Sequence, residues 1–137
     1  MTMTYRTRHC LVSAIDTWYL AALEGTVTAG SITVPVGMNK IVQLYTAAGD
    51  STPTAASRNH GLIAKIVGVN DGEALLVLNG TTGTGVTGGD FGTEQGSFRR
   101  DVDIPVTPGK IVSVYICATS GVDTSAPLAG VTLGFSS

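Results

Sequence analysis

A partial internal repeat at an offset of 70 residues constrains the fold of this chain more than any other feature. Residues 32–45 align without a gap on residues 102–115. The identical pairs are Pro35 and Pro105, Val36 and Val106, Lys40 and Lys110, Ile41 and Ile111, Val42 and Val112, and Tyr45 and Tyr115. In each copy a β-branched run ends at proline, and a glycine-containing turn leads into a second strand-like run. The repeat predicts two strand–turn–strand units, either similar halves of a β-sandwich or one turn sequence used twice.

The low proportion of charged residues predicts that much of the surface is covered by other subunits. The 137 residues are enough for one domain, and 43% of them are hydrophobic, which argues against disorder. Only 13% are charged, about half of the ~25% that is usual. Interfaces of permanent assemblies are depleted of charge. The alternative is a soluble monomer with an exterior rich in Thr and Ser.

The charge distribution argues against direct nucleic-acid binding. The net charge is −2, and the basic pairs are Arg6 with Arg8 and Arg99 with Arg100, without a dense basic run. The first eight residues lack the apolar core of a signal peptide, and no stretch approaches the ~20 apolar residues of a membrane span. We therefore expect a soluble chain that is made in a cytoplasm and has no membrane span.

Short apolar runs separated by turn signals predict an all-β fold. Eight or nine strands in one antiparallel β-sandwich, of jelly-roll type, fit this pattern. The clearest hairpin joins runs 62–69 and 74–78 through Asn70-Asp71-Gly72. Alternating apolar residues predict a last strand over 128–135. We assign residues 11–137 to the sandwich domain and residues 1–10 to an extended N-terminal segment.

Residues 9–23 are ambiguous, because their apolar residues fit both a helix and a pair of strands. Leu11, Ile15 and Trp18 fall at helical spacing, whereas Trp18, Leu20 and Ala22 alternate as one face of a strand. Two short strands are favoured because every later segment reads as β. Three polar segments are predicted to be loops: residues 47–59, the glycine-rich residues 79–96, and residues 119–127.

The residues that could carry catalysis or bind a metal do not form a recognisable set, so we predict no catalytic, cofactor-binding or metal-binding residues. His9 and His60 lack the spacing of zinc ligands, and no nucleophile motif is present. Cys10 and Cys117 lie in apolar runs and are predicted to be buried thiols, with a disulfide as the alternative. The acidic candidates are aspartates that we assign to turns or to one face of a strand: Asp50, Asp71, Asp90, Asp101, Asp103 and Asp123.

Two further features also have an ordinary structural interpretation. The segment Asn79–Gly85 lacks the lysine and the following helix of a phosphate-binding loop, and its Asn79-Gly80-Thr81 sequon needs a secretory route to be used. Tyr45 and Tyr115 occupy matched places in the repeat and could stack on sugars. Burial in the sandwich with a hydrogen-bonded hydroxyl is the favoured reading for both tyrosines.

The chain resembles the small jelly-roll capsid, decoration or cement proteins of bacterial and archaeal viruses. The resemblance is one of style, and it extends from about Trp18 to Ser137. It is carried by the glycine-, threonine- and alanine-rich composition, the turn Val34-Pro35-Val36-Gly37, and the closing strand Ala129–Phe135. It implies a non-enzymatic structural component of a virion, commonly a homotrimer, that is held by contacts with other capsid proteins.

The elements expected to make these contacts are residues 2–10, 47–59 and 80–96. The main alternative is a carbohydrate- or receptor-binding sandwich, such as a fibre tip, although most of the eight aromatic residues are expected in strand cores. An enzyme is the third hypothesis, and it would need a cleft that converges on His9 or His60.

Overall fold

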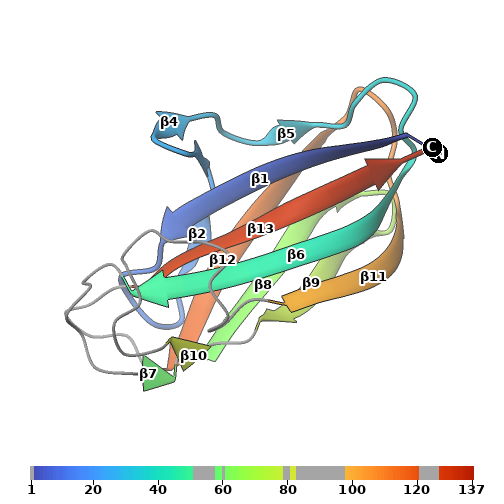
Figure 1. Ribbon diagram of the computed structural model, residues 1–137. Helices are drawn as coiled ribbons and strands as arrows, with labels where there is room; N and C mark the ends of the chain where they lie inside the picture. Colours follow the sequence, from blue (N-terminus) through green and yellow to red (C-terminus); the bar gives the residue numbers. More distant parts are fainter. Residues whose placement is uncertain (1, 51–57, 60, 79–80, 83–97, 121–126) are drawn as a thin grey trace.

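The computed structural model describes residues 2–50, 58–59, 61–78, 81–82, 98–120 and 127–137. These residues form an all-β structure in which two antiparallel sheets pack face to face (Figure 1). The strands are β1 (Met3–Leu11), β2 (Trp18–Leu20), β3 (Leu23–Glu24), β4 (Val27–Thr28), β5 (Ile32–Thr33), β6 (Lys40–Asp50), β7 (Arg58–Asn59), β8 (Gly61–Val69), β9 (Gly72–Leu78), β10 (Thr81–Thr82), β11 (Phe98–Pro105), β12 (Ile111–Ser120) and β13 (Pro127–Ser136). The prediction of an all-β sandwich is confirmed.

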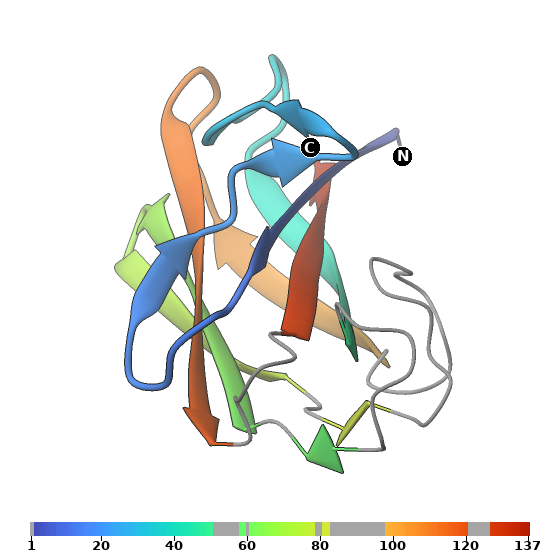
Figure 2. The ribbon, with the colours of Figure 1, turned by 90° about the vertical axis from the view of Figure 1, so that its left-hand side faces the viewer.

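The two layers differ in strand number and lie on opposite sides of the core. Sheet A has the order β11-β6-β13-β1-β3-β4, and sheet B has the order β2-β12-β8-β9, with β5 paired to β12. Strands β7 and β10 form a separate small ladder. Sheet A lies in front of sheet B in Figure 1, and the view along the layers in Figure 2 separates them.

The long strands pair in a nested order. The first strand, β1, pairs along its length with the last, β13, from Met3 opposite Ser136 to Leu11 opposite Leu128. Next inward along the chain, β2 pairs with β12 and β6 pairs with β11. The innermost pair is the hairpin of β8 and β9. This order places both ends of the chain side by side (Figure 1).

The core follows from side-chain alternation along the central strands. On β13, Val131, Leu133 and Phe135 are fully buried, as the predicted last strand requires. Sheet B faces them with alternating residues from β12 and β8, which are Val112, Val114, Ile116, Leu62, Ala64 and Ile66. Burying each large aliphatic or aromatic side chain contributes about 1.5–3 kcal/mol, so this stripe holds the layers together.

The predicted hairpin at residues 62–78 is confirmed, and it contains a feature that the sequence pattern did not indicate. Asn70 and Asp71 form the turn, and the register shifts between Val67 and Val69, where Gly68 adopts a φ of +94°. A Cβ atom on Gly68 would lie 2.3 Å from the carbonyl oxygen of Ile111. Glycine is required here because the β12 backbone passes too close for any side chain.

The two segments of the internal repeat pair with each other reciprocally. In sheet B, β5 from the first segment pairs with β12 from the second. In sheet A, β6 from the first segment pairs with β11 from the second. The turns also meet, since Val106 N donates to Asn39 O at 3.0 Å and Gly109 N donates to Val34 O at 3.0 Å.

The N-terminal part of the chain differs in part from the expectation. Residues 9–23 contain strands, as favoured, with β2 and β3 after the end of β1. Residues 1–10 were expected as an extended segment ahead of the sandwich domain. Residues 3–10 are extended, but they form most of β1 inside sheet A, because β13 supplies backbone partners along this whole stretch.

The first predicted loop, residues 47–59, begins later in the structure, because β6 is longer than predicted. Residues 47–50 continue β6 and pair with residues 127–130 of β13, so the strand ends later than the polar composition indicated. Arg58–Asn59 and Thr81–Thr82 pair as β7 and β10. The remaining parts of the predicted loops, residues 51–57, 60, 79–80, 83–97 and 121–126, lie outside the described residues.

Candidate interaction surfaces

The residues considered for catalysis are dispersed. His9 is buried on β1 opposite Gly130, and His60 lies outside the described residues. Within the part of the chain that the structure describes, no three His, Cys, Asp or Glu side chains come together as a metal site. Asp101 lies on the edge strand β11, where it pairs with Arg99 at 3.1 Å, and a register shift separates it from Ile104.

Both cysteines are buried free thiols, as predicted. Burial raises the pKa of the Cys10 thiol to about 12. Burial also raises the pKa of Cys117, and the carboxylate of Asp16 adds to the effect. Neither thiol is activated as a nucleophile, because the thiolate is the reactive form and both environments disfavour it.

The expectation that both matched tyrosines are buried is wrong for Tyr45, which is exposed, and is met only in part by Tyr115, which is half-buried. Tyr45 and Tyr115 both point away from the core, Tyr45 on the outer face of sheet A and Tyr115 on the outer face of sheet B. Tyr45 is 38% exposed, and its ring meets Tyr5 edge-on with centroids 6.2 Å apart. Side chains alternate between the two faces of a strand. The neighbours of each tyrosine in the chain are buried in the core, so each tyrosine lies on the outer face of its sheet.

Other aromatic residues also lie on the outer faces. Among the described side chains, Tyr5 and Trp18 are exposed, whereas Phe135 is in the core and Tyr19 packs against it. The expectation that most aromatic residues fill strand cores is therefore not met by these residues. Their exposure makes the outer faces of the two sheets the candidate interaction surfaces.

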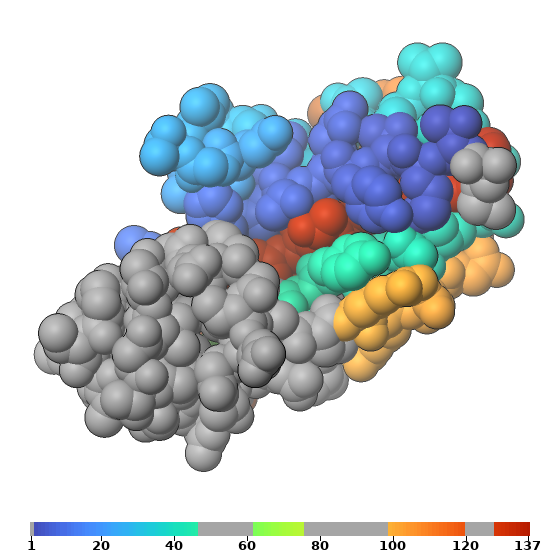
Figure 3. Space-filling view, in the orientation of Figure 1, coloured from blue at the N-terminus to red at the C-terminus, as the bar shows by residue number. Residues whose placement is uncertain are grey.

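The outer face of sheet A is polar and internally hydrogen-bonded. Tyr5 Oη donates to Gln43 Oε1 at 2.9 Å, and the hydroxyls of Thr7 and Thr132 lie 2.7 Å apart. Figure 3 looks onto this face, with β1, β6 and β11 across it. Gly134 on β13 lies opposite Tyr5, and a Cβ atom at this position would lie 3.0 Å from Tyr5 Cε1.

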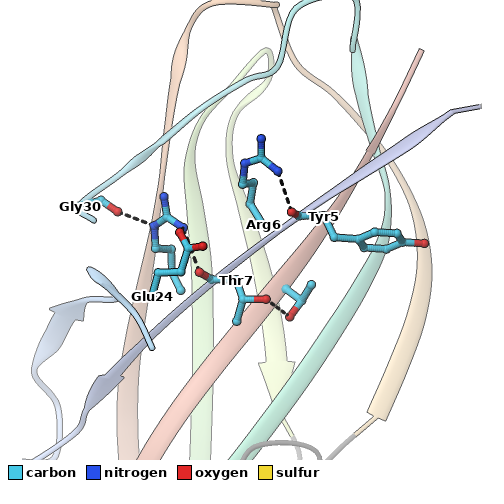
Figure 4. A network of polar contacts seen from close by, with 7 residues as sticks. Tyr5, Arg6, Thr7, Glu24 and Gly30 are labelled. Atoms are coloured by element: carbon cyan, nitrogen blue, oxygen red, sulfur yellow. Dashed lines mark hydrogen bonds and ion pairs between the residues drawn. The ribbon is translucent and has the colours of Figure 1, made fainter. Parts of the chain in front are cut away.

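Arg8 fastens the β3–β4 hairpin to β1. Its Nε donates to Gly30 O at 2.8 Å, and its Nη1 donates to Thr7 O and to Glu24 Oε2, each at 2.9 Å. Figure 4 shows Glu24 and Gly30 converging on this guanidinium, whereas the neighbouring Arg6 reaches only the backbone oxygen of Tyr5 among the contacts drawn. Arg8 is 6% exposed, so its three hydrogen bonds stabilise a buried charge.

The outer face of sheet B is mostly apolar and aromatic, and Ser113, Lys65 and Glu73 are among its polar members. Strand registers align one row across it, which is Leu20, Tyr115, Lys65 and Leu75. The next row contains Trp18, Cys117 and Ile63. Trp18 is 37% exposed and Leu75 is 62% exposed, whereas Cys117 is buried. Residues facing each other on neighbouring strands share a face, so these rows form one continuous surface.

Lys65 is the one lysine of these rows, and its charge is compensated within the face. Its Nζ lies 4.4 Å from the centroid of the Trp18 ring and 5.7 Å from that of Tyr115. The carboxylate of Glu73 lies 3.9 Å from the same nitrogen. Cation–π contacts and the ion pair therefore leave this face with little uncompensated charge.

The sequence contained a partial signal for this surface. The alternation of Trp18 with Leu20 predicted that both side chains lie on one face of a strand. Whether that face points to the core or to the outside depends on how the strand pairs with β12. The expected contact elements are placed differently: residues 3–10 lie within sheet A, and most of the other two elements lie outside the described residues.

In the described parts of the chain, no helix has the length and apolar character needed to cross a membrane. Neither a protein-family model nor a curated protein matches this chain.

Proposed function

We propose that this protein is a structural component of a virion, either a capsid protein or a decoration (cement) protein. It acts through protein–protein contacts with copies of itself, as a homotrimer, and with other capsid proteins. It is made in the host cytoplasm and resides in the virus particle, and it has no enzymatic activity.

The exposed apolar face of sheet B is the observation that carries the proposal. Trp18, Leu20 and Leu75 are exposed on it, and the charge of Lys65 is compensated by its neighbours. A contiguous apolar face with few charges is typical of a surface that a protein partner covers. The low charge of the whole chain supports the same reading.

The strand order supports a jelly-roll fold for this protein. The pairs β1–β13, β2–β12, β6–β11 and β8–β9 nest within one another along the chain, as in a long antiparallel ribbon rolled into two sheets. Jelly rolls of this kind build viral capsids, and they also occur in lectins. The fold is thus compatible with the proposed role and with its main alternative.

We also propose that the two repeat segments are structurally equivalent. Their reciprocal pairing supports this, since β5 pairs with β12 while β6 pairs with β11. The outward positions of Tyr45 and Tyr115 on opposite sheets agree with an approximate two-fold exchange of the segments.

Light scattering coupled to size-exclusion chromatography tests the proposal. We expect a discrete oligomer, with regular particles or capsomers in negative-stain electron microscopy. Trp18 is the single tryptophan, so acrylamide quenching of its fluorescence reports coverage of sheet B. Quenching should weaken as the protein concentration rises. A monomer at every concentration, with Trp18 equally quenchable throughout, would contradict the proposal.

The alternative function is carbohydrate or receptor binding, and the outer face of sheet A favours it. Tyr5 and Tyr45 are exposed there beside Gln43 and Asp101, which combines aromatic surface with polar groups. A glycan array tests this directly. Binding that is lost in Tyr45→Ala would support the alternative, and an array without binding would count against it.

A further inference from the structure

We propose that a second copy of this chain pairs with β9 along the edge that no other described strand occupies, so that the two copies of sheet B form one continuous sheet about a two-fold axis. This inference rests on the proposed function and adds a second contact to it. The subunits of one trimer are related by a three-fold axis, so the two-fold pair at β9 would join copies from two different trimers. It is carried by a contrast between β9 and the other strands that end a sheet.

Strand β9 is a long and regular edge. It is the last strand of sheet B among the described residues, and its register with β8 is unbroken from Glu73 to Leu78. Its seven residues contain no proline, and Glu73 is their one charged residue. An edge of this kind presents unpaired backbone donors and acceptors to another strand.

The other edges are unsuitable for strand pairing. On β11 the register shifts between Asp101 and Ile104, and the strand ends at Pro105. This strand carries four charged residues, which are Arg99, Arg100, Asp101 and Asp103. Strand β2 has three residues and β4 has two. Bulges, several charges, proline and short length are the features that prevent edge-to-edge association. Strand β9 has seven residues, one charge and no proline, and its register with β8 shifts only at its first residue, Gly72.

A second copy is the occupant that fits this edge. An antiparallel strand pair is self-complementary about a two-fold axis, because each strand offers its partner the same pattern of donors and acceptors. Leu75 is 62% exposed at the end of the row Leu20, Tyr115, Lys65 and Leu75. Pairing centred on Leu75 sets the two leucines against each other and extends this apolar row across both copies.

Charge favours the same arrangement. Glu73 pairs with Lys65 at 3.9 Å within one copy, so the face carries little charge to repel its own copy. With the axis at Leu75, Glu73 lies opposite position 77 of the second copy and not opposite a second glutamate. Like charges directly opposite each other would destabilise the pair.

Disulfide trapping of the full-length protein tests the geometry. Residues that face each other across an antiparallel pair have Cα atoms about 4.5–5.5 Å apart, within the range of a disulfide. We expect Leu75→Cys to form a covalent dimer with copper phenanthroline and oxygen, which accept the two hydrogens released by the thiols. The native cysteines are buried. Val27→Cys is the matched control, because Val27 is 65% exposed on β4, and it should stay uncross-linked.

A second pair of variants tests the energetics. Leu75→Lys places like charges opposite each other and should weaken self-association by about tenfold or more, whereas Val27→Lys should leave it unchanged. Circular dichroism establishes that each variant is folded, and trapping of Leu75→Cys gives the answer if Leu75→Lys does not fold. An oligomeric wild type whose Leu75→Cys variant is not trapped more than Val27→Cys would overturn the inference alone. A wild type that is monomeric throughout would overturn the proposed function as well.

Discussion

The buried guanidinium of Arg8 lies 2.9 Å from the carboxylate of Glu24, and this contact joins β1 to the β3–β4 hairpin. Glu24 is largely exposed, so the pair is solvated on one side only. Arg8 also donates to Gly30 O, which makes it the link between three segments. Its removal should therefore affect the hairpin more than the sheet.

Arg8→Met should lower the free energy of unfolding by about 2–3 kcal/mol, because hydrogen bonds made by a charged group are lost and Gly30 O loses its partner. Hydrogen exchange should accelerate at the amides of Ala29 and Gly30, which donate to Ala22 O. The control is Arg6→Met on the same strand, where an exposed side chain should cost less than about 0.5 kcal/mol. Equal losses in the two variants would contradict the role assigned to Arg8.

Gly68→Ala should be more destabilising than Gly72→Ala. Both glycines have a positive φ, +94° and +96°, so both substitutions carry a backbone cost of about 1–2 kcal/mol. A Cβ on Gly68 also meets the backbone of Ile111, whereas nothing lies within 4 Å of a Cβ on Gly72. Urea unfolding measures the difference, and Gly68→Ala should lose at least about 2 kcal/mol more. A difference near zero would mean that β12 moves aside freely.

Thr46→Val and Thr132→Val should change stability in opposite directions. The Thr46 hydroxyl is buried, and among the described residues it has no hydrogen-bond partner. Replacing it with a methyl group removes the desolvation cost and should stabilise the fold by about 1 kcal/mol. The same change at Thr132 breaks the 2.7 Å bond to Thr7 and should destabilise it by about 1 kcal/mol. Thermal unfolding of both variants checks the signs.

The Cys10 thiol should make stability fall at alkaline pH. Its pKa is about 12 in the folded protein against 9.0 for an unperturbed thiol, so the unfolded chain releases a proton that the folded chain retains. Between pH 9 and 12 the free energy of unfolding should therefore decrease by about 1.4 kcal/mol per pH unit from this group. Denaturant unfolding at pH 8 and pH 10.5 measures the decrease. Cys10→Ala supplies the control, because tyrosines and lysines titrate in both proteins, and identical pH slopes would contradict the assignment.

Strands and turns that are specified by residues close together in the chain could be predicted from the sequence. The hairpin at residues 62–78 and the strand ending in Phe135 follow from alternation and turn residues, and both are present. The length of β6 and the place of residues 3–10 could not be read locally. Backbone pairing with β13 extends both strands through residues whose composition is neutral or polar.

Three properties follow from the residue pattern alone: strands that alternate with proline and glycine turns, buried cysteines, and few charges. The side chains that share a face follow only from the pairing of the strands in three dimensions. Trp18, Lys65 and Tyr115 are far apart in the chain, and pairing through β12 brings them together. The alternation of side chains along a strand depends only on residues next to one another in the chain. The neighbours across a sheet depend on the register between segments that are distant in the chain.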